Sequence, residues 1–306
     1  SLIAQAGLFE AAYARFRDPL FRDVLAQCYR YVERGGGYAL LNPERIAPAS
    51  EPLRQESFRF EDAGFALLRS PEATVVLKYG PHGGGHGHPD KLSISVHDGR
   101  KELVSDFGTS AYGAPDYTKW YRKTLAHNTV TVDGRDQSET AGEFVAFESR
   151  PDGGMVAARA DRAYPGVEMS RRLTLKGAGL SDRFVCRSDG THRYDYVLLF
   201  NERPALNGKS LGAVSFGEEP YARIRNAERY AFKRGFVIRT GDAEVRIDAS
   251  APVEVFVGEA SGIPPTNPGV KTVSGSEKRP VQPAYPVIVR MTGRTMTIDA
   301  QWKINP

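Results

Sequence analysis

Six histidines occur in this chain of 306 residues, and five of them lie between positions 82 and 127. Random placement would scatter them, so the cluster is the strongest chemical signal in the sequence. Its centre is the segment GPHGGGHGHPDK, in which His86 and His88 are two residues apart. Glycines before a histidine pair let the backbone adopt positive φ angles and let a ligand approach closely. On a strand, residues two apart share a face, so the pair predicts an acid–base or metal geometry.

Asp106 and His127 are the residues that could complete a metal site with His88. Asp106 follows the pair Asp98-Gly99, which predicts a hairpin turn, so we expect it on the far strand of that hairpin or just beyond. His127 opens the predicted strand HNTVTVD. Two imidazoles and one carboxylate are reasonable zinc ligands, with a fourth position open to water or substrate. The alternative is that these histidines are hydrogen-bonded structural groups in a polar loop.

Two further sets of residues flank this cluster. Asp90 and Lys91 predict a local ion pair or outer support for the histidines. An aromatic-rich segment from residue 112 to 122 ends at an arginine; such side chains can stack on sugar rings and pair with a carboxylate, or can cap a sandwich edge. The candidate substrate contacts are His82, Tyr112, Tyr117, Arg122 and Asn128. The chain contains no GxSxG, P-loop or CxxC pattern.

The elements that must position these residues change character along the chain. Apolar residues at three- and four-residue spacing predict two helices in the first 34 residues, with their apolar stripes packed on one end of the following domain. Asp18-Pro19 starts the second helix, and a run of three glycines ends it. From about residue 55, short Val-, Phe- and Tyr-rich runs alternate with turn residues, which predicts a large antiparallel β-sandwich. The predicted fold is α+β, mostly β, with a helical segment at 1–50 and the sandwich at 51–306.

Composition excludes several classes of protein. Charged residues make up 25% and hydrophobic residues 41%, which is typical of a globular chain. No run approaches the roughly 18 apolar residues of a spanning helix, so we expect no membrane partner. The net charge of +4 is spread among acids without a basic arm, which argues against nucleic acid. Two cysteines, Cys28 and Cys186, cannot form a disulfide framework and are expected to be lone buried thiols.

The segments around the histidines also resemble a known family. GPHGGGHGHPDKLS, then DFGTSAYGAPDY, then WYRKTLAHNTVTVDG, is similar to the heparinase II/III-like polysaccharide lyases, a resemblance that is dense from Gly80 to Gln137. It implies an α-helical toroid followed by a sandwich, and β-elimination at a uronic acid in the cleft between them. It also implies that His86 is the catalytic histidine and that His88, Asp106 and His127 bind a zinc ion that keeps the cleft-side sheet in shape.

The same resemblance implies that part of the machinery lies outside this chain. The family's catalytic tyrosine and its Asn or His partner come from the toroid, and here the two predicted helices would be only the end of one. We therefore expect the C-terminal half of a lyase, inactive or nearly so by itself unless Tyr112 or Tyr117 substitutes. The expected partner is an anionic polysaccharide or oligosaccharide, in the periplasm or outside the cell. Two other classes stay open: a non-catalytic carbohydrate-binding sandwich, and a zinc-dependent hydrolase.

Overall fold

The computed structural model describes residues 5–41, 44–51, 56–110, 113–262 and 282–305. These residues divide into two compact units, a helical one before residue 56 and a strand-rich one from residue 56 onward. No described helix has both the length and the apolar character needed to cross a membrane. Both cysteines are buried, as expected, with Cys28 in the helical unit and Cys186 in the strand-rich unit.

The described part of the first unit contains three α-helices, α1 (Ala6–Phe16), α2 (Pro19–Cys28) and α3 (Gly37–Leu41). The Asp18 side chain caps α2 by accepting a hydrogen bond of 2.8 Å from the Leu20 backbone N–H, as the Asp-Pro pair predicts. The short helix α3 was not expected, because its first residue belongs to the glycine run that was taken only as a stop. A small core holds the unit together; its buried members are Tyr13, Leu25, Tyr29 and Ile46. That the apolar stripes pack on the sandwich stays a prediction.

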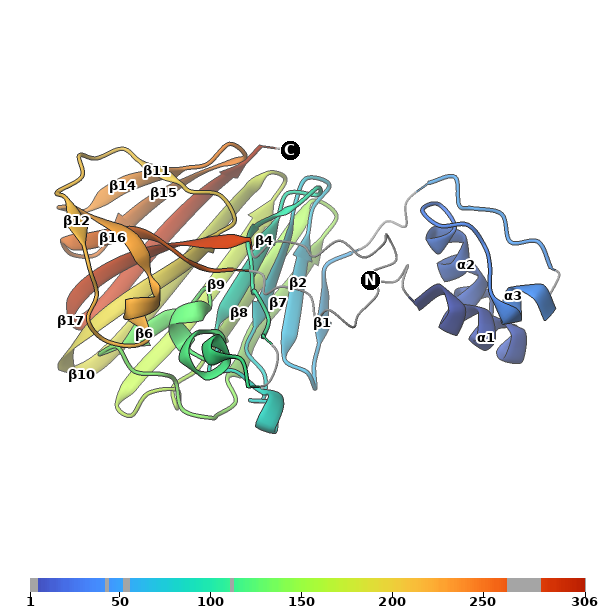
Figure 1. The fold of residues 1–306 in the computed structure, drawn as a ribbon, viewed down its shortest axis with the longest axis horizontal. Helices are drawn as coiled ribbons and strands as arrows, with labels where there is room; N and C mark the ends of the chain where they lie inside the picture. Colours follow the sequence, from blue (N-terminus) through green and yellow to red (C-terminus); the bar gives the residue numbers. More distant parts are fainter. Residues whose placement is uncertain (1–4, 42–43, 52–55, 111–112, 263–281, 306) are drawn as a thin grey trace. The chain divides into compact units, whose positions relative to one another are not determined.

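Seventeen strands, all in antiparallel pairs, make up the described part of the second unit (Figure 1). In chain order they are β1 (Phe58–Phe60), β2 (Phe65–Arg69), β3 (Thr74–Lys78), β4 (Ser93–His97), β5 (Glu102–Val104), β6 (Val130–Val132), β7 (Glu143–Arg150), β8 (Gly153–Arg159), β9 (Val167–Lys176), β10 (Gly179–Phe200), β11 (Ala205–Leu206), β12 (Ala213–Val214), β13 (Arg225–Phe232), β14 (Gly235–Arg239), β15 (Ala243–Ala249), β16 (Val253–Ser261) and β17 (Pro283–Ile304). The predicted antiparallel β-sandwich is confirmed. The Gly- and Pro-rich sequence of residues 261–283 predicts a loop, and this segment falls almost wholly outside the described residues.

Two long strands carry this architecture. β10 and β17, with 22 residues each, pair from Gly179 opposite Lys303 to Phe200 opposite Tyr285. On β9, beside β10, alternate residues are buried, which is how a strand behaves when one face packs on a core. The core joins β2, β3 and β4 to β8, β9 and β10, so the first strands of the unit cover the face of the later ones. The histidine-rich segments connect the strands of this covering layer.

Pairs of a glycine and an aspartate, which favour hairpin turns, lie between strands at three places. Asp98-Gly99 lies between β4 and β5, and Gly241-Asp242 lies between β14 and β15. At Asp133-Gly134 both residues have positive φ, 54° and 72°, as a type I′ turn requires. This third turn returns the chain only to an isolated bridge between Val132 and Arg135, not to a second strand.

A buried ion pair fixes the backbone next to the histidines. Arg171 on β9 donates to both carboxylate oxygens of Asp182 on β10, at 2.8 and 2.5 Å, and the Tyr196 hydroxyl donates to the same carboxylate at 2.8 Å. The remaining guanidinium nitrogen of Arg171 donates to the backbone oxygens of Leu92 and Asn128, at 2.7 and 2.6 Å. These three side chains, called the arginine cluster below, are at most 1% exposed. They tie the core sheet to the residues that follow Lys91 and His127.

Candidate functional site

The structure brings His88, Asp106 and His127 together from three separate segments. His88 lies in the glycine-rich connection between β3 and β4, Asp106 lies two residues beyond β5, and His127 lies three residues before β6. The rings of His88 and His127 have centroids 5.2 Å apart, and Nδ1 of His127 is 3.5 Å from a carboxylate oxygen of Asp106. Asp106 is therefore where the hairpin argument placed it. We call these three residues the histidine cluster.

His86 and His88 do not share a strand face, which corrects the reasoning from their two-residue spacing. Gly83 and Gly84 have left-handed φ values of 88° and 62°, and Gly84–His86 forms a 3₁₀ turn. The glycines that allow this turn also remove the extended geometry on which the same-face argument depends. His86 is exposed and His88 is half-buried, so the turn separates one solvent-facing imidazole from one in the cluster. His127 likewise precedes its strand and does not open it.

His127 is a buried polar group whose hydrogen-bonding capacity is unmet. Its residue is 1% exposed, and neither ring nitrogen has a hydrogen-bond partner within the described part of the chain. The nearest carboxylate, that of Asp106, is 3.5 Å away, too far for a well-formed hydrogen bond. Buried polar groups almost always have a partner, because leaving one without a partner costs about 1–3 kcal/mol. A bound cation would supply this partner.

Two of the three side chains, His88 and Asp106, are in the charge state that binds a metal, and a metal at His127 would displace a proton. Burial, and then the charge of His127, lower the pKa of His88 to about 4, so its imidazole is neutral at pH 7. Burial acts to raise the pKa of Asp106, but the charge of His127 and the hydrogen bond from the Gly108 backbone N–H hold it well below its ordinary value. Burial acts to lower the pKa of His127, and the charge of Asp106 outweighs it and raises that pKa. Neutral imidazoles and ionised carboxylates are the ligating forms.

Asp90 and two lysines adjoin the cluster. Asp90, Asp106 and His127 each offer one possible ligand atom, and these atoms lie within 4.8 Å of one another. The buried carboxylate of Asp90 forms ion pairs with Lys78 and with the fully buried Lys91, the latter at 3.2 Å, which confirms the expected Asp90–Lys91 pair. Sequence reasoning missed Lys78, which lies ten residues before His88 on β3, and no local pattern marks it.

His82 and Arg122 line a second feature, a pocket of about 270 Å³. Its lining residues are His82, Pro89, Thr118, Arg122, Lys123, Asp136, Gln137 and Glu139. Arg122 donates to the backbone oxygen of Gly87 at 3.2 Å, and its guanidinium carbon lies 5.6 Å from the Tyr117 ring centre. The pocket, called the His82 pocket below, therefore adjoins the peptide between His86 and His88. Tyr112 lies outside the described residues.

Asn128 has a different place from the one expected of a substrate contact. Its residue is fully buried, and its amide nitrogen donates to the backbone oxygens of Ile94 and Ser105, at 2.8 and 2.9 Å. Its amide oxygen accepts from the Leu199 backbone N–H at 2.6 Å. These bonds engage both ends of the buried amide, so Asn128 braces three backbone segments behind His127 and presents nothing to a ligand. Sequence reasoning could not see this, because all three partners lie at least 23 residues away.

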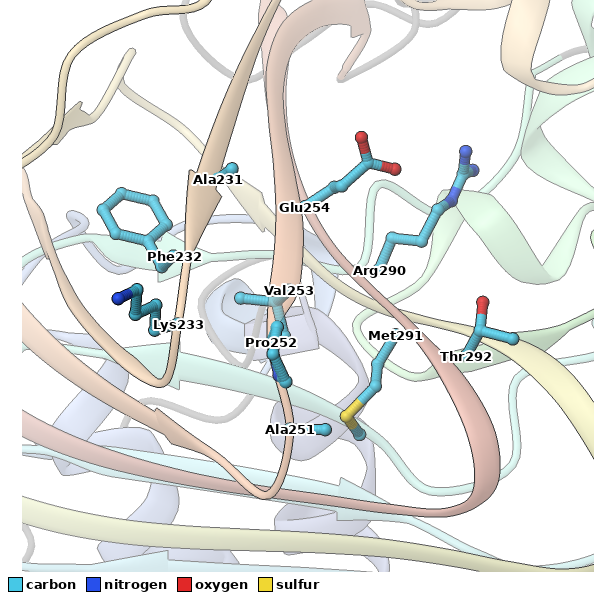
Figure 2. A pocket seen from close by; sticks show the side chains of 10 residues that line it. All are labelled: Ala231, Phe232, Lys233, Ala251, Pro252, Val253, Glu254, Arg290, Met291 and Thr292. Atoms are coloured by element: carbon cyan, nitrogen blue, oxygen red, sulfur yellow. The ribbon is translucent and has the colours of Figure 1, made fainter.

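A larger groove, of about 590 Å³, lies elsewhere on the strand-rich unit. It is formed by the turn after β13, the turn before β16 and the middle of β17 (Figure 2). Figure 2 shows Phe232 and Lys233 on one side of the β16 segment and Arg290 and Thr292 on the other. None of the candidate site residues lines this groove, so its larger volume does not mark the candidate active site.

Comparison with known proteins identifies relatives of this chain. Residues 52–263 match the family model described as heparinase II/III-like, C-terminal. An alginate lyase from Stenotrophomonas maltophilia is 28% identical over 249 residues, covering 68% of this chain and 32% of that protein. An exo-oligoalginate lyase from Saccharophagus degradans is 31% identical over 153 residues, covering 42% of this chain and 20% of that one. The chain thus spans a third or less of these relatives.

Solved structures agree at the level of the fold. A heparan sulfate lyase from Pedobacter heparinus superposes with a TM-score of 0.63 at 14% identity, covering 100% of this chain and 42% of that one. A heparinase III structure superposes with a TM-score of 0.62 at 13% identity, covering 92% and 41%. At this identity the likeness concerns architecture, and the family model, which matches more than half of the chain, settles membership. This chain belongs to the heparinase II/III-like family and contains its C-terminal sandwich.

Proposed function

We propose that this chain is part of a polysaccharide lyase that cleaves an anionic, uronate-containing glycan by β-elimination, and that it supplies the sandwich half of the active cleft. Family membership and the names of the curated relatives, which are alginate and heparin-sulfate lyases, support the reaction class. The observation that carries the proposal for this chain is the turn that exposes His86 directly beside the buried histidine cluster.

The reaction requires three things of the protein. The C5–H bond breaks and its proton passes to a base, the C4–O4 bond breaks and O4 takes a proton, and the electron pair forms the C4–C5 double bond. The C5 proton is too weakly acidic unless the neighbouring carboxylate is neutralised or hydrogen-bonded. In this proposal the exposed His86 meets the reacting uronate, either as the neutral base for that proton or as the donor to that carboxylate. An imidazole titrates near neutral pH and can serve in either role.

We also propose that His88, Asp106 and His127 bind a zinc ion. The unmet hydrogen-bonding groups of His127, the neutral state of His88 and the ionised state of Asp106 support this donor set. When bound, zinc would cross-link the segments before β4, after β5 and before β6, so its contribution is to folding and not to a chemical step. Elemental analysis of freshly purified protein tests this; a chain that carries no metal when prepared with zinc contradicts it.

The catalytic tyrosine is proposed to come from a helical toroid domain like that of the longer relatives, and Tyr117 to contact substrate. The sandwich alone would then be inactive or nearly so. The test is absorbance near the ultraviolet edge after adding alginate, heparosan or hyaluronan to a protein that includes the toroid. Elimination creates a conjugated double bond and a rising signal. New reducing ends without that signal would indicate a hydrolase, and binding without either product would indicate a carbohydrate-binding module.

A further inference from the structure

We propose that the His82 pocket is a subsite for one non-sulfated uronate residue of the glycan, and that Glu139 at its edge disfavours sulfated sugars. This inference rests on the proposed function, because it assumes that an acidic glycan lies along the His86 turn. It goes beyond that function in two respects. It locates a sugar-binding subsite on the sandwich, and it specifies that the sugar bound there is not sulfated.

The first argument is His82 itself. Its side chain is only 9% exposed, and neither ring nitrogen has a hydrogen-bond partner among the residues that the structure describes. The nearest acidic oxygen, on Glu139, is 3.5 Å from Nε2. The ring cannot easily turn elsewhere, because Gly87 packs against it so closely that an added Cβ would lie 1.8 Å from the His82 backbone oxygen and 2.7 Å from its ring. A fixed, unsatisfied imidazole that lines a pocket calls for a polar ligand.

The second argument is the balance of charge in the pocket. Lys123 is paired with Asp136 at 2.8 Å, and the other oxygen of Asp136 accepts from the Thr124 backbone N–H at 2.9 Å, so this pair is already neutral. What then faces a ligand is one guanidinium, one imidazole and one carboxylate, those of Arg122, His82 and Glu139.

A uronate sugar is chemically complementary to these three side chains. A uronate ring carries one carboxylate, which suits a guanidinium and an imidazole donor, and several hydroxyls, which suit a carboxylate acceptor. The Arg122 guanidinium is held in place by the Gly87 oxygen at 3.2 Å, so it does not have to be ordered on binding. The volume of about 270 Å³ lies just below the range of drug-sized pockets, which fits a single sugar ring.

Glu139 provides the discrimination. A sulfate group is an additional permanent anion, and placing it beside the Glu139 carboxylate brings like charges together. Glu139 is 74% exposed, so solvent screens the repulsion and the expected effect on affinity is about threefold to fivefold.

The experiment uses the 306-residue chain and two heparosan tetrasaccharides of equal length, one non-sulfated and one sulfated, titrated by calorimetry. The wild-type chain should bind the non-sulfated probe more tightly. His82→Gln should weaken that binding by about tenfold or more, the usual effect of losing a hydrogen bond to a charged group. His97→Gln, on β4 and outside the pocket, is the matched control and should bind as wild type does. Glu139→Gln should strengthen binding of the sulfated probe by about threefold. It should not strengthen binding of the non-sulfated probe, because the glutamine amide oxygen still accepts from the sugar hydroxyls.

Wild-type preference for the sulfated probe, or unchanged binding by a folded His82→Gln, overturns the proposal. If His82→Gln does not fold, the ring resonances of His82 in the wild-type chain decide: they must shift on titration with the non-sulfated probe, and unshifted resonances overturn the subsite. The absorbance assay separates this from the lyase proposal. Elimination with unchanged KM in His82→Gln refutes the subsite alone, whereas binding at His82 without any unsaturated product from a toroid-containing protein refutes the lyase alone.

Discussion

The arginine cluster and the histidine cluster are two buried polar groups in the same sheet layers, and they differ in how completely the protein satisfies them. Arg171, Asp182 and Tyr196 are bonded to one another and to two backbone oxygens, so that cluster is complete without a ligand. In the histidine cluster, His127 is equally buried, but neither ring nitrogen has a hydrogen-bond partner among the described residues. The first cluster is a structural brace, and the second has the unmet groups of a binding site.

Hydrogen bonds from the arginine cluster reach the backbone beside the histidine cluster, which explains how the fold holds the unsatisfied His127 in place. Arg171 holds the backbone oxygen of Asn128, the residue after His127, and that of Leu92, the residue after Lys91. The Asn128 amide bonds three further backbone groups at the same place, those of Ile94, Ser105 and Leu199. The protein thus uses a fully satisfied network to hold an unsatisfied one, as a preorganised site requires.

The largest effect is expected from breaking the brace. Arg171→Met leaves the Asp182 carboxylate buried without its cation, which should lower the free energy of unfolding by about 3–5 kcal/mol. Urea denaturation measures this. The control is the double variant Arg171→Met with Asp182→Leu, which removes both charges and should recover much of the loss. A single variant that loses less than about 1 kcal/mol would show that the brace is dispensable.

Removing metal should affect only the histidine cluster. If zinc is bound at 1,000 times its dissociation constant, a chelator should lower the free energy of unfolding of the wild-type chain by about 4 kcal/mol. His127→Ala should be insensitive to the chelator, because it lacks a ligand. Arg183→Met, which removes an exposed ion pair with Asp299, is a suitable control and should respond as the wild type does. An equal response in His127→Ala would mean that the metal sits elsewhere.

His86 and His88 lie two residues apart, and we expect their replacement by alanine to have different effects. In a toroid-containing protein, His86→Ala should lower turnover by about 100-fold, close to 2.7 kcal/mol, because it removes an acid–base or carboxylate-neutralising group. Its stability and metal content should stay near the wild-type values, because His86 is exposed. His88→Ala should lose activity, metal and stability together. Turnover of His86→Ala within a few fold of wild type would remove His86 from the mechanism.

The histidine cluster can be predicted from the sequence, whereas the arginine cluster cannot. Period-two patterns mark β2 and β3 well, because one face of each packs on the core. The sequence predicts the histidine cluster because five of the six histidines, and Asp106, lie between positions 82 and 127, in a stretch whose motifs are also those of the family. The prediction that His86 lies on a strand is wrong, because Gly83 and Gly84 adopt left-handed angles and the two-residue spacing does not reveal the 3₁₀ turn that follows. Arg171 and the role of Asn128 were missed because their bonds span 11 to 79 residues.

The Asp98 carboxylate is only partly satisfied by hydrogen bonds, so in this respect it lies between the two clusters. We expect its replacement to give the smallest change in stability, and that change depends on pH. Its side chain is fully buried, and one oxygen accepts from the backbone N–H groups of Arg100 and Lys101, both at 2.8 Å, in the β4–β5 turn. The other oxygen has no hydrogen bond among the described residues and lies 3.6 Å from the Arg100 guanidinium. Burial acts to raise the pKa of Asp98, but the two backbone hydrogen bonds outweigh it and lower that pKa below 3.8.

A carboxyl whose pKa is lower in the folded state than in the unfolded state stabilises the fold above its unfolded pKa, and this contribution is lost as the pH falls through its folded pKa. Asp98→Asn keeps an oxygen for the turn and removes only the charge, so it should cost about 1 kcal/mol at pH 7. Urea denaturation at pH 7 and at steps below pH 4 should show the difference between wild type and Asp98→Asn shrinking toward zero in acid. Asp98→Ala, which also removes the acceptor, should stay less stable than Asp98→Asn throughout. A difference that is constant with pH would mean that the turn depends on the shape of the side chain and not on its charge, and Asp98 would then belong with the brace.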